Sequence, residues 1–129
     1  MISEFIPVDI AQFILDKINS VAQLEALLLL RNSPGKTWTI QALAGRLYID
    51  EKQTAELLAS VCALGFATTV ADEPLQYQYQ PNSTEIREMV DRVAEIYSKH
   101  LLPVTNLIHS KPKARVQEFA DAFKFRKDD

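Results

Sequence analysis

Residues 39–66 constrain the fold more than any other part of the chain, because they predict two short helices joined by a very short turn. Thr39 is a suitable N-cap for the first helix, since its hydroxyl can accept a hydrogen bond from a free amide of the first turn. Asp50, followed three residues later by Gln53, is the capping-box pattern at the start of the second helix. Gly65 can adopt the left-handed conformation that ends this helix.

Both predicted helices carry one apolar face. In the first helix, at residues 40–48, the apolar positions that recur at helical spacing are Ile40, Leu43, Ala44 and Leu47. The buried face predicted for the second helix consists of Thr54, Leu57, Leu58, Val61 and Leu64. Apart from the cap, only Ile49 separates the two helices. A turn this short does not fit an antiparallel helical hairpin and indicates the steep crossing of a helix-turn-helix.

A small β-hairpin is predicted directly after Gly65. Residues 66–71 are rich in β-branched and aromatic side chains, and residues 72–74 are typical of a turn. Residues 75–80 alternate between apolar side chains and glutamine, which is the period of a half-buried strand. Pro81 cannot continue the ladder and is expected to end it.

A helix-turn-helix followed at once by a small hairpin resembles the winged-helix family, and the resemblance covers residues 20–81. Besides the hairpin, the residues that carry it are Ile40, Leu43, Ala44, Leu47, Ile49, Leu58, Val61, Leu64, Gly65 and Phe66. The predicted fold class is mainly α with a small β-hairpin: a winged helix-turn-helix with a long C-terminal helix and an additional short tail helix. The resemblance implies DNA binding, with the second helix in the major groove and the wing and helix ends on phosphates.

Two further helices are predicted before this region. The first has Pro7 in its first turn, where the missing amide proton costs nothing. The second is capped by Ser20 with Gln23, is strongly apolar, and ends at the turn signal of residues 32–35. Residues 36–38 can form a short edge strand that leads into the helix-turn-helix.

The longest helical pattern follows the hairpin, with Asn82 and Glu85 as its predicted cap pair. Pro103 removes one helical hydrogen bond and is expected to kink or split this helix. Two ion pairs at i, i+4 are expected on its outer face: Glu88 with Arg92, and Glu95 with Lys99. The sequence is therefore divided into a winged-helix domain with an N-terminal helix at residues 1–81 and a C-terminal helical dimerisation and tail segment at residues 82–129.

The apolar residues of this long helix alternate in spacing between three and four, as in a coiled-coil seam. One interpretation is that the helix covers the core of its own chain. The other is that it pairs with a second copy, and the length of the apolar stripe favours this homodimer. The dimer-interface candidates are Ile86, Met89, Val93, Ile96, His100 and Leu107. For His100, packing in the seam is the main expectation and a pH-sensitive seam is the functional alternative.

The tail, residues 111–129, is predicted to contain a separate short helix. Val116, Phe119, Ala120 and Phe123 recur at helical spacing, and Phe125 adds further aromatic surface. A surface of this kind is expected to be covered, either by the body of the chain or by a partner subunit. Buried packing is expected there rather than a ligand pocket.

The charge pattern bears directly on DNA binding, because counterion release on contact between basic side chains and phosphates supplies much of the affinity. Residues 31–49 contain three basic residues and no acidic one, whereas residues 50–65 contain one lysine and three acids. The predicted hairpin tip carries Asp72 and Glu73, which repel phosphates. The candidates for DNA contact are Lys36, Arg46, Lys52, Gln53 and Ser60.

Two functions of different class remain open. In the first, the chain resembles small bacterial transcription regulators and binds double-stranded DNA as a homodimer, with Gln53 at a base edge and the three cations on phosphates. In the second, the winged helix is a protein–protein interaction module without DNA binding, whose acidic helix and wing meet a basic protein partner. The fold alone does not separate them.

An enzyme is not expected: no catalytic residue, metal site or cofactor is predicted. The three glycines are too scattered for a phosphate-binding loop, and His100 and His109 have no cysteine or acidic partner at metal-ligand spacing. Cys62 is the only cysteine and is expected to be a small core residue. With no long apolar run and no signal-peptide pattern, the sequence predicts a cytoplasmic protein without a membrane partner.

Overall fold

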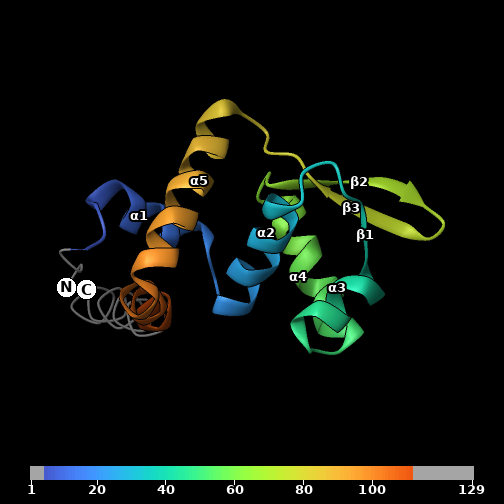
Figure 1. Cartoon of the computed structure of the whole chain (residues 1–129), viewed down its shortest axis with the longest axis horizontal. Coiled ribbons are helices and arrows are strands. Elements are labelled where there is room, and N and C mark those ends of the chain that lie inside the picture. Colours follow the sequence, from blue (N-terminus) through green and yellow to red (C-terminus); the bar gives the residue numbers. More distant parts are fainter. Residues whose placement is uncertain (1–4, 112–129) are drawn as a thin grey trace, which may run out of the picture.

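The computed structural model describes residues 5–111 of the chain. Its helices and strands are α1 (Val8–Lys17), α2 (Val21–Asn32), β1 (Trp38–Thr39), α3 (Ile40–Leu47), α4 (Glu51–Ala63), β2 (Ala67–Asp72), β3 (Leu75–Tyr79) and α5 (Thr84–Lys99), followed by a helical segment at residues 101–111. In Figure 1, α1 and α5 lie together at one side, α3, α4 and the sheet at the other, and α2 between them. No helix in this part of the chain is both long and apolar enough to cross a membrane.

The predicted helix caps are confirmed, with one exception. Thr39 Oγ1 accepts from the Ala42 amide at 3.0 Å, and Asp50 Oδ1 accepts from the Gln53 amide at 2.6 Å. Helix α5 is capped by Ser83 rather than by Asn82. The reason is that Asn82 still belongs to the preceding connection, where its backbone amide donates to the Gly65 carbonyl at 2.8 Å.

The turn between α3 and α4 is slightly longer than predicted. Helix α3 ends at Leu47, and Tyr48 follows in the left-handed conformation with φ of 58°. At its other end, α4 stops as expected at Gly65, whose φ is 85°. The Phe66 amide then donates to the Val61 carbonyl at 3.1 Å, which satisfies one of the free carbonyls of the last turn.

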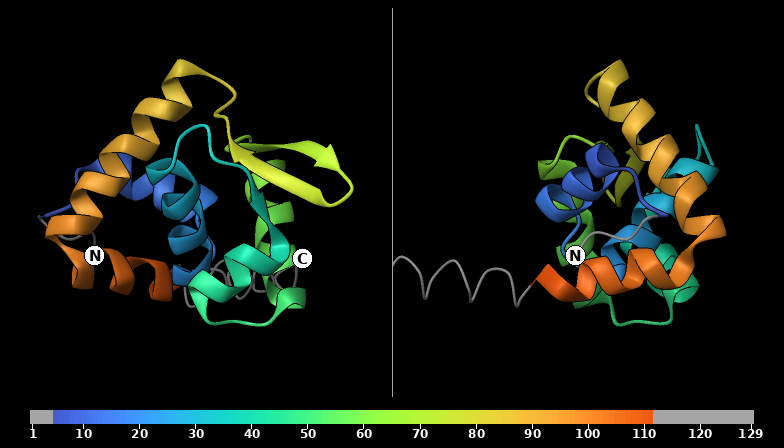
Figure 2. Two further views of the ribbon diagram at one scale, coloured as in Figure 1. Left: turned by 45° about the vertical axis from the view of Figure 1, so that its right-hand side comes forward. Right: turned by 90° about the vertical axis from the view of Figure 1, so that its left-hand side faces the viewer.

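The three strands form an antiparallel sheet in the order β1-β3-β2. The short edge strand before α3 is confirmed, because Trp38 pairs with Tyr77 and Thr39 with Gln76. The register of β2 against β3 shifts between Thr69 and Ala71, which makes a β-bulge. The β2–β3 hairpin projects away from the helices in Figure 1 and in the left-hand view of Figure 2.

The described residues share one hydrophobic core that includes α5. Its side chains come from α1, α2, α3 and α4, from Trp38 and Tyr77 of the sheet, from α5, and from the segment 101–111. Val90 and Val93 of α5 are buried in this core, so α5 covers its own chain with that face. The predicted division at residue 81 does not correspond to two separate cores. That the part after residue 81 serves dimerisation stays a prediction.

Helix α5 is interrupted before Pro103, as the sequence predicts. It ends at Lys99, the His100 amide closes it by donating to the Ile96 carbonyl at 2.7 Å, and the next helical segment begins at residue 101. The chain changes direction sharply there (Figure 2). Pro103 lies in the first turn of the new segment, where its missing amide proton breaks no helical bond. The predictions for Phe119, Phe123 and Phe125 concern residues outside the described range of 5–111.

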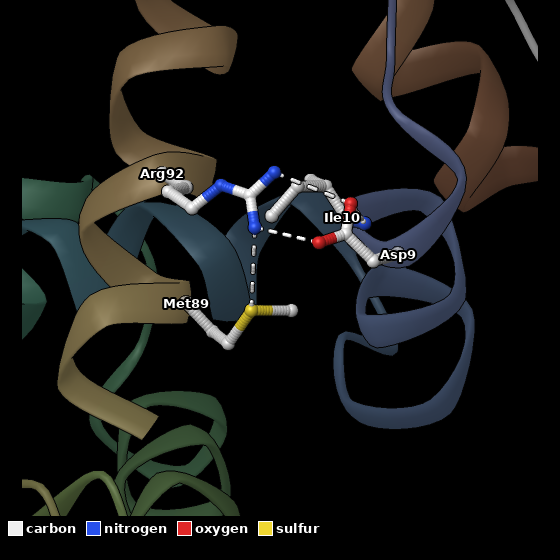
Figure 3. Close-up of polar contacts among 4 residues, drawn as sticks. All are labelled: Asp9, Ile10, Met89 and Arg92. Carbon is white, nitrogen blue, oxygen red and sulfur yellow. Dashed lines mark hydrogen bonds and ion pairs between the residues drawn. The ribbon is translucent and has the colours of Figure 1, made fainter. Parts of the chain in front are cut away.

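Of the two ion pairs predicted on α5, only one forms as expected. Lys99 Nζ lies 3.1 Å from Glu95 Oε1. Arg92 does not pair with Glu88: its guanidinium instead contacts both carboxylate oxygens of Asp9 at the start of α1, at 2.6 and 3.2 Å (Figure 3). The bidentate geometry available across the α1–α5 contact is better than that available along one helix.

The Asp9–Arg92 pair has a measurable pH signature. The hydrogen bond from Arg92 holds the pKa of Asp9 below its usual value. In the variant Arg92→Gln, the pKa of Asp9, followed by NMR titration, is expected to rise toward that usual value. Because the folded-state pKa is the lower one, the pair stabilises the fold above the unfolded-state pKa, and this contribution is lost as pH falls through the folded-state pKa.

The matched control for this titration is Lys99→Gln, which removes one positive charge from the same helix and leaves the Asp9 carboxylate with its partner. The pKa of Asp9 is expected to stay depressed in that variant. An Asp9 pKa that is equal in the wild type and in Arg92→Gln would contradict the bidentate contact.

Candidate nucleic-acid interface

Helix α4 presents a polar first turn on the outside of the helix-turn-helix. Its buried face consists of Thr54, Leu58 and Val61, which pack into the core, while Leu57 and Leu64 are half-buried. Lys52 and Gln53 are exposed in the first turn, as predicted for DNA-contact residues. This turn is also acidic, since Asp50 caps it and Glu51 is exposed beside them.

Lys36 and Arg46 are brought together over the indole ring of Trp38. The Lys36 ammonium nitrogen lies 3.9 Å from the ring centroid, and the guanidinium carbon of Arg46 lies 5.9 Å from it. Trp38 itself is 1% exposed, so a buried ring fixes two exposed cations on one surface. One cation comes from the loop before β1 and the other from the last turn of α3. We call Lys36 and Arg46 the Trp38 cation pair.

Arg31 does not belong to this basic surface. Its Nε lies 2.8 Å from Asp91 Oδ1 and joins α2 to α5. The three basic residues counted in the sequence between positions 31 and 49 are thus divided: one forms an ion pair within the chain, and two remain on the outside of the helix-turn-helix.

Ser60 is half-buried and faces α2. Its Oγ accepts from Gln23 Nε2 at 3.0 Å, and its hydroxyl donates to the Leu57 carbonyl at 2.7 Å. The hydroxyl is therefore engaged inside the chain and is not available to DNA. The sequence placed it on α4 correctly, but its direction depends on where α2 packs.

Tyr48 is a surface residue that the sequence reasoning did not select. It is 94% exposed, in the turn between α3 and α4, and its left-handed backbone is sparsely populated for residues with a Cβ. An exposed phenol beside the start of α4 can donate to a phosphate or stack on a base. Nothing in the local sequence distinguishes this tyrosine from one that ends the apolar face of α3.

The hairpin tip carries the acidic pair predicted for it. Asp72 and Glu73 are both exposed, and Val70 and Leu75 are the partly exposed apolar residues next to them. The tip therefore offers no positive charge to a phosphate. Its negative charge would repel phosphate groups brought close to it.

The six dimer-interface candidates differ in their exposure. Val93 and Leu107 are buried in the core of their own chain, whereas Ile86, Met89 and Ile96 are half-buried against it. His100 is half-buried and stacks on Phe5, with 4.8 Å between the ring centroids. Large exposed apolar side chains lie around the start of α1 and directly after His100: Phe5, Val8, Leu101 and Leu102. We call these four residues the apolar corner.

Reactive and metal-binding groups do not mark a second site. Cys62 is half-buried, and burial raises the pKa of its thiol, which keeps it protonated at neutral pH. Among residues 5–111, no group of three or more His, Cys, Asp or Glu side chains is placed to hold a metal ion.

Comparison with known proteins supports the fold. No protein-family model and no curated protein matches the sequence. Among solved structures, a MepR–DNA complex from S. aureus has a TM-score of 0.55 at 13% identity and covers 87% of this chain and 86% of that one. A mutant MarR from E. coli has a TM-score of 0.53 at 12% identity, with 98% of each chain covered.

Reduced HlyU from Vibrio cholerae has a TM-score of 0.52 at 20% identity and covers 69% of this chain and 90% of that one. At such identities a structural likeness shows the fold alone. The short α3–α4 turn, the hairpin that follows it and these similarities together show that the chain has the winged helix-turn-helix fold.

Proposed function

We propose that this protein is a transcription regulator that binds double-stranded DNA as a homodimer in the cytoplasm. The observation that carries the proposal is the Trp38 cation pair, which holds two positive charges on the outside of the helix-turn-helix. One solved structure of similar fold is a DNA complex, which supports the same use of this fold.

In the proposed complex, each residue has a role that fits its chemistry. Gln53 is exposed in the first turn of α4 and offers an amide for a base edge in the major groove. Lys52, Lys36 and Arg46 contact phosphates on either side of that groove. Tyr48, in the turn before α4, adds an exposed hydroxyl donor. The acidic hairpin tip stays clear of the duplex, so the phosphate contacts come from the helix-turn-helix.

The acidic surface supports a second candidate function, a protein–protein interaction module. Glu51 and Glu56 are exposed on α4, and Asp72 and Glu73 are exposed at the hairpin tip. A basic protein partner would meet four carboxylates there and would also find the exposed side chains of Val70 and Leu75. In this function α4 and the wing bind protein, and the chain has no affinity for DNA.

Titration of random duplex DNA with increasing salt separates the two functions. Regulators of this kind show non-specific affinity at low ionic strength, and the logarithm of the binding constant falls linearly with the logarithm of the salt concentration. Three phosphate contacts per subunit, six per dimer, predict a slope of about −5. Lack of binding at low salt would exclude the DNA-binding function and leave the interaction module.

For the dimer, the proposed contact surface is the apolar corner together with the half-buried residues Ile86, Met89 and Ile96 of α5. Leu102 is 67% exposed, and Leu101 and Phe5 are about half exposed. Burial of apolar surface stabilises an interface by about 25 cal/mol per Å² before the costs of association. Val93 and Leu107 are left out, because they are already buried within one chain.

Replacement of Leu102 by glutamate is expected to convert the dimer into a monomer, because a carboxylate cannot be desolvated at the centre of an apolar contact without a partner. Sedimentation velocity at micromolar concentration measures this change. Val70→Glu at the hairpin is the control, since it places the same charge on another partly exposed apolar position. If Leu102→Glu and the wild type sediment alike, the apolar corner is not the dimer contact.

A further inference from the structure

A series of hydrogen bonds runs from the end of the helical segment 101–111 to the linker between α1 and α2. Lys111 Nζ donates to the Ile18 carbonyl at 3.1 Å and to Asn19 Oδ1 at 2.8 Å. The backbone amide of Asn19 in turn donates to Gln23 Oε1 at 2.5 Å. The C-terminal end of the described chain is therefore connected by polar contacts to the first turn of α2.

Gln23 continues this series to α4. Its Nε2 donates to Ser60 Oγ at 3.0 Å, and the Ser60 hydroxyl donates to the Leu57 carbonyl at 2.7 Å. Both ends of the Gln23 amide are thus occupied, one by the α1–α2 linker and the other by α4. Two of the three contacts between Lys111 and Ser60 join residues 92 and 37 positions apart in the sequence and so link distant parts of the chain, while the third is a local contact between Asn19 and Gln23.

Because these side chains are buried, their hydrogen-bond partners must stay in fixed positions. Gln23 is 1% exposed and Lys111 is 7% exposed. A buried amide or ammonium that loses a partner has no water to replace it, whereas apolar side chains can slide past one another with little loss. The directional contacts of Gln23 therefore select one position of α4 among those that the apolar core alone would accept.

We propose that Gln23 is a positioning residue for α4, and that Lys111 acts through it, so that the C-terminal helical segment and the helix proposed to read DNA are held in one relative arrangement. A change at either end is then transmitted to the other. The coupling itself is a property of the fold, and only its consequence for DNA affinity rests on the proposed function.

Hydrogen–deuterium exchange of the full chain tests the coupling without DNA. Lys111→Met removes the ammonium and keeps the length of the side chain. It is expected to speed exchange of the α4 amides at least threefold, as well as that of residues 18–23. Lys99→Met is the matched control, because it removes the same charge from an exposed ion pair. The proposal is overturned if Lys111→Met affects residues 18–23 and leaves α4 as in the wild type.

Ser60→Ala tests the same coupling in the opposite direction and removes only one hydroxyl. Because coupling between two sites is reciprocal, exchange is expected to speed up in residues 18–23 and in the segment 101–111. This variant carries the test if Lys111→Met does not fold. Faster exchange confined to α4 in Ser60→Ala would show that Gln23 does not transmit the change, and would overturn the proposal.

Binding of random duplex DNA at low salt adds the functional readout. Lys111→Met and Gln23→Leu are each expected to weaken binding at least threefold, and Lys99→Met less than twofold. If the wild type binds no DNA, the proposed function fails and the exchange experiments still decide the coupling. If the wild type binds and both variants bind equally well, the position of α4 set by Gln23 does not govern recognition.

Discussion

Replacing Lys36 and Arg46 together by glutamine is expected to lower the affinity for random duplex DNA at least about 100-fold. A hydrogen bond to a charged group contributes roughly 1.5–3 kcal/mol, and about 1.4 kcal/mol corresponds to a factor of ten in the dissociation constant. Glutamine keeps part of the aliphatic stem that covers Trp38, so the loss is mainly one of charge. Fluorescence anisotropy with a labelled duplex at low salt measures the effect.

The salt dependence identifies the cause of this loss. Each phosphate contact that is removed lowers the slope of log affinity against log salt by about one, so the double variant is expected to lose about two per subunit. The control is Lys17→Gln with Lys99→Gln, which removes the same net charge from α1 and α5. If the control and the double variant lose affinity equally, only net charge matters and the Trp38 cation pair is not a contact site.

This result also separates the two candidate functions. A protein-interaction module that uses the acidic residues of α4 and the hairpin does not need Lys36 or Arg46, so its partner binding survives the double substitution. The converse variant, Asp72→Asn with Glu73→Gln, removes the charge that repels phosphates at the hairpin tip. A regulator is expected to bind DNA more tightly after that change, because two unfavourable charges are gone.

Local features of the chain were predictable because they depend on neighbours in the sequence. The caps at Thr39 and Asp50 each satisfy an amide three residues away, and Gly65 ends α4 through its own backbone preference. The winged helix-turn-helix followed from these stops and from two periodicities, and the structure confirms it. The cap of α5 was misassigned by one residue, since Asn82 has a partner in the α4–β2 connection.

Contacts between distant segments could not be predicted in the same way. Periodicity shows which side of a helix is buried, but not which neighbour covers it. For that reason Arg92 was paired with Glu88 on its own helix, although Asp9, 83 positions away, offers the better geometry. The same limit applies to the apolar spacing of α5, whose central residue Val93 is covered by the core of its own chain.

The candidate site was predicted in its parts and not in its arrangement. Lys36, Arg46, Lys52 and Gln53 were selected by charge and position, and all four are exposed. What the sequence did not contain was the buried indole that gathers two of them, or the exposure of Tyr48, because both depend on how β1 pairs with β3 and how α3 ends.

Gly65→Ala is expected to lower the stability of the fold for two separate reasons, a strained backbone and a steric clash. A Cβ at this position would collide with Asn82 Nδ2 and would lie 2.9 Å from Asn82 Cγ. The residue also has φ of 85°, where a side chain costs roughly 1–2 kcal/mol. Displacement of the exposed Asn82 side chain adds to this backbone cost, so the free energy of unfolding is expected to fall by at least about 1–2 kcal/mol.

Gly35 provides a matched control that separates the backbone strain at Gly65 from the clash with Asn82. Gly35 has nearly the same φ, 81°, but a Cβ there would meet no atom within 4 Å. Urea unfolding followed by circular dichroism is therefore expected to show that Gly35→Ala loses only the backbone part, about 1–2 kcal/mol. Adding Asn82→Ala to Gly65→Ala is expected to recover the stability that Gly65→Ala loses beyond Gly35→Ala, because it removes the atoms that collide with the new Cβ.

Equal losses in Gly35→Ala and Gly65→Ala would mean that Asn82 moves aside without cost, and that the contact between the α4–β2 connection and the start of α5 is loose. A larger loss at Gly65 places a rigid joint at the point where α4, the hairpin and α5 meet. The acidic hairpin is then held at a fixed angle to α4, and a bound duplex cannot push it away. In that case Gly65→Ala, at a temperature where it remains folded, changes DNA affinity by altering the position of the hairpin and not by removing a contact.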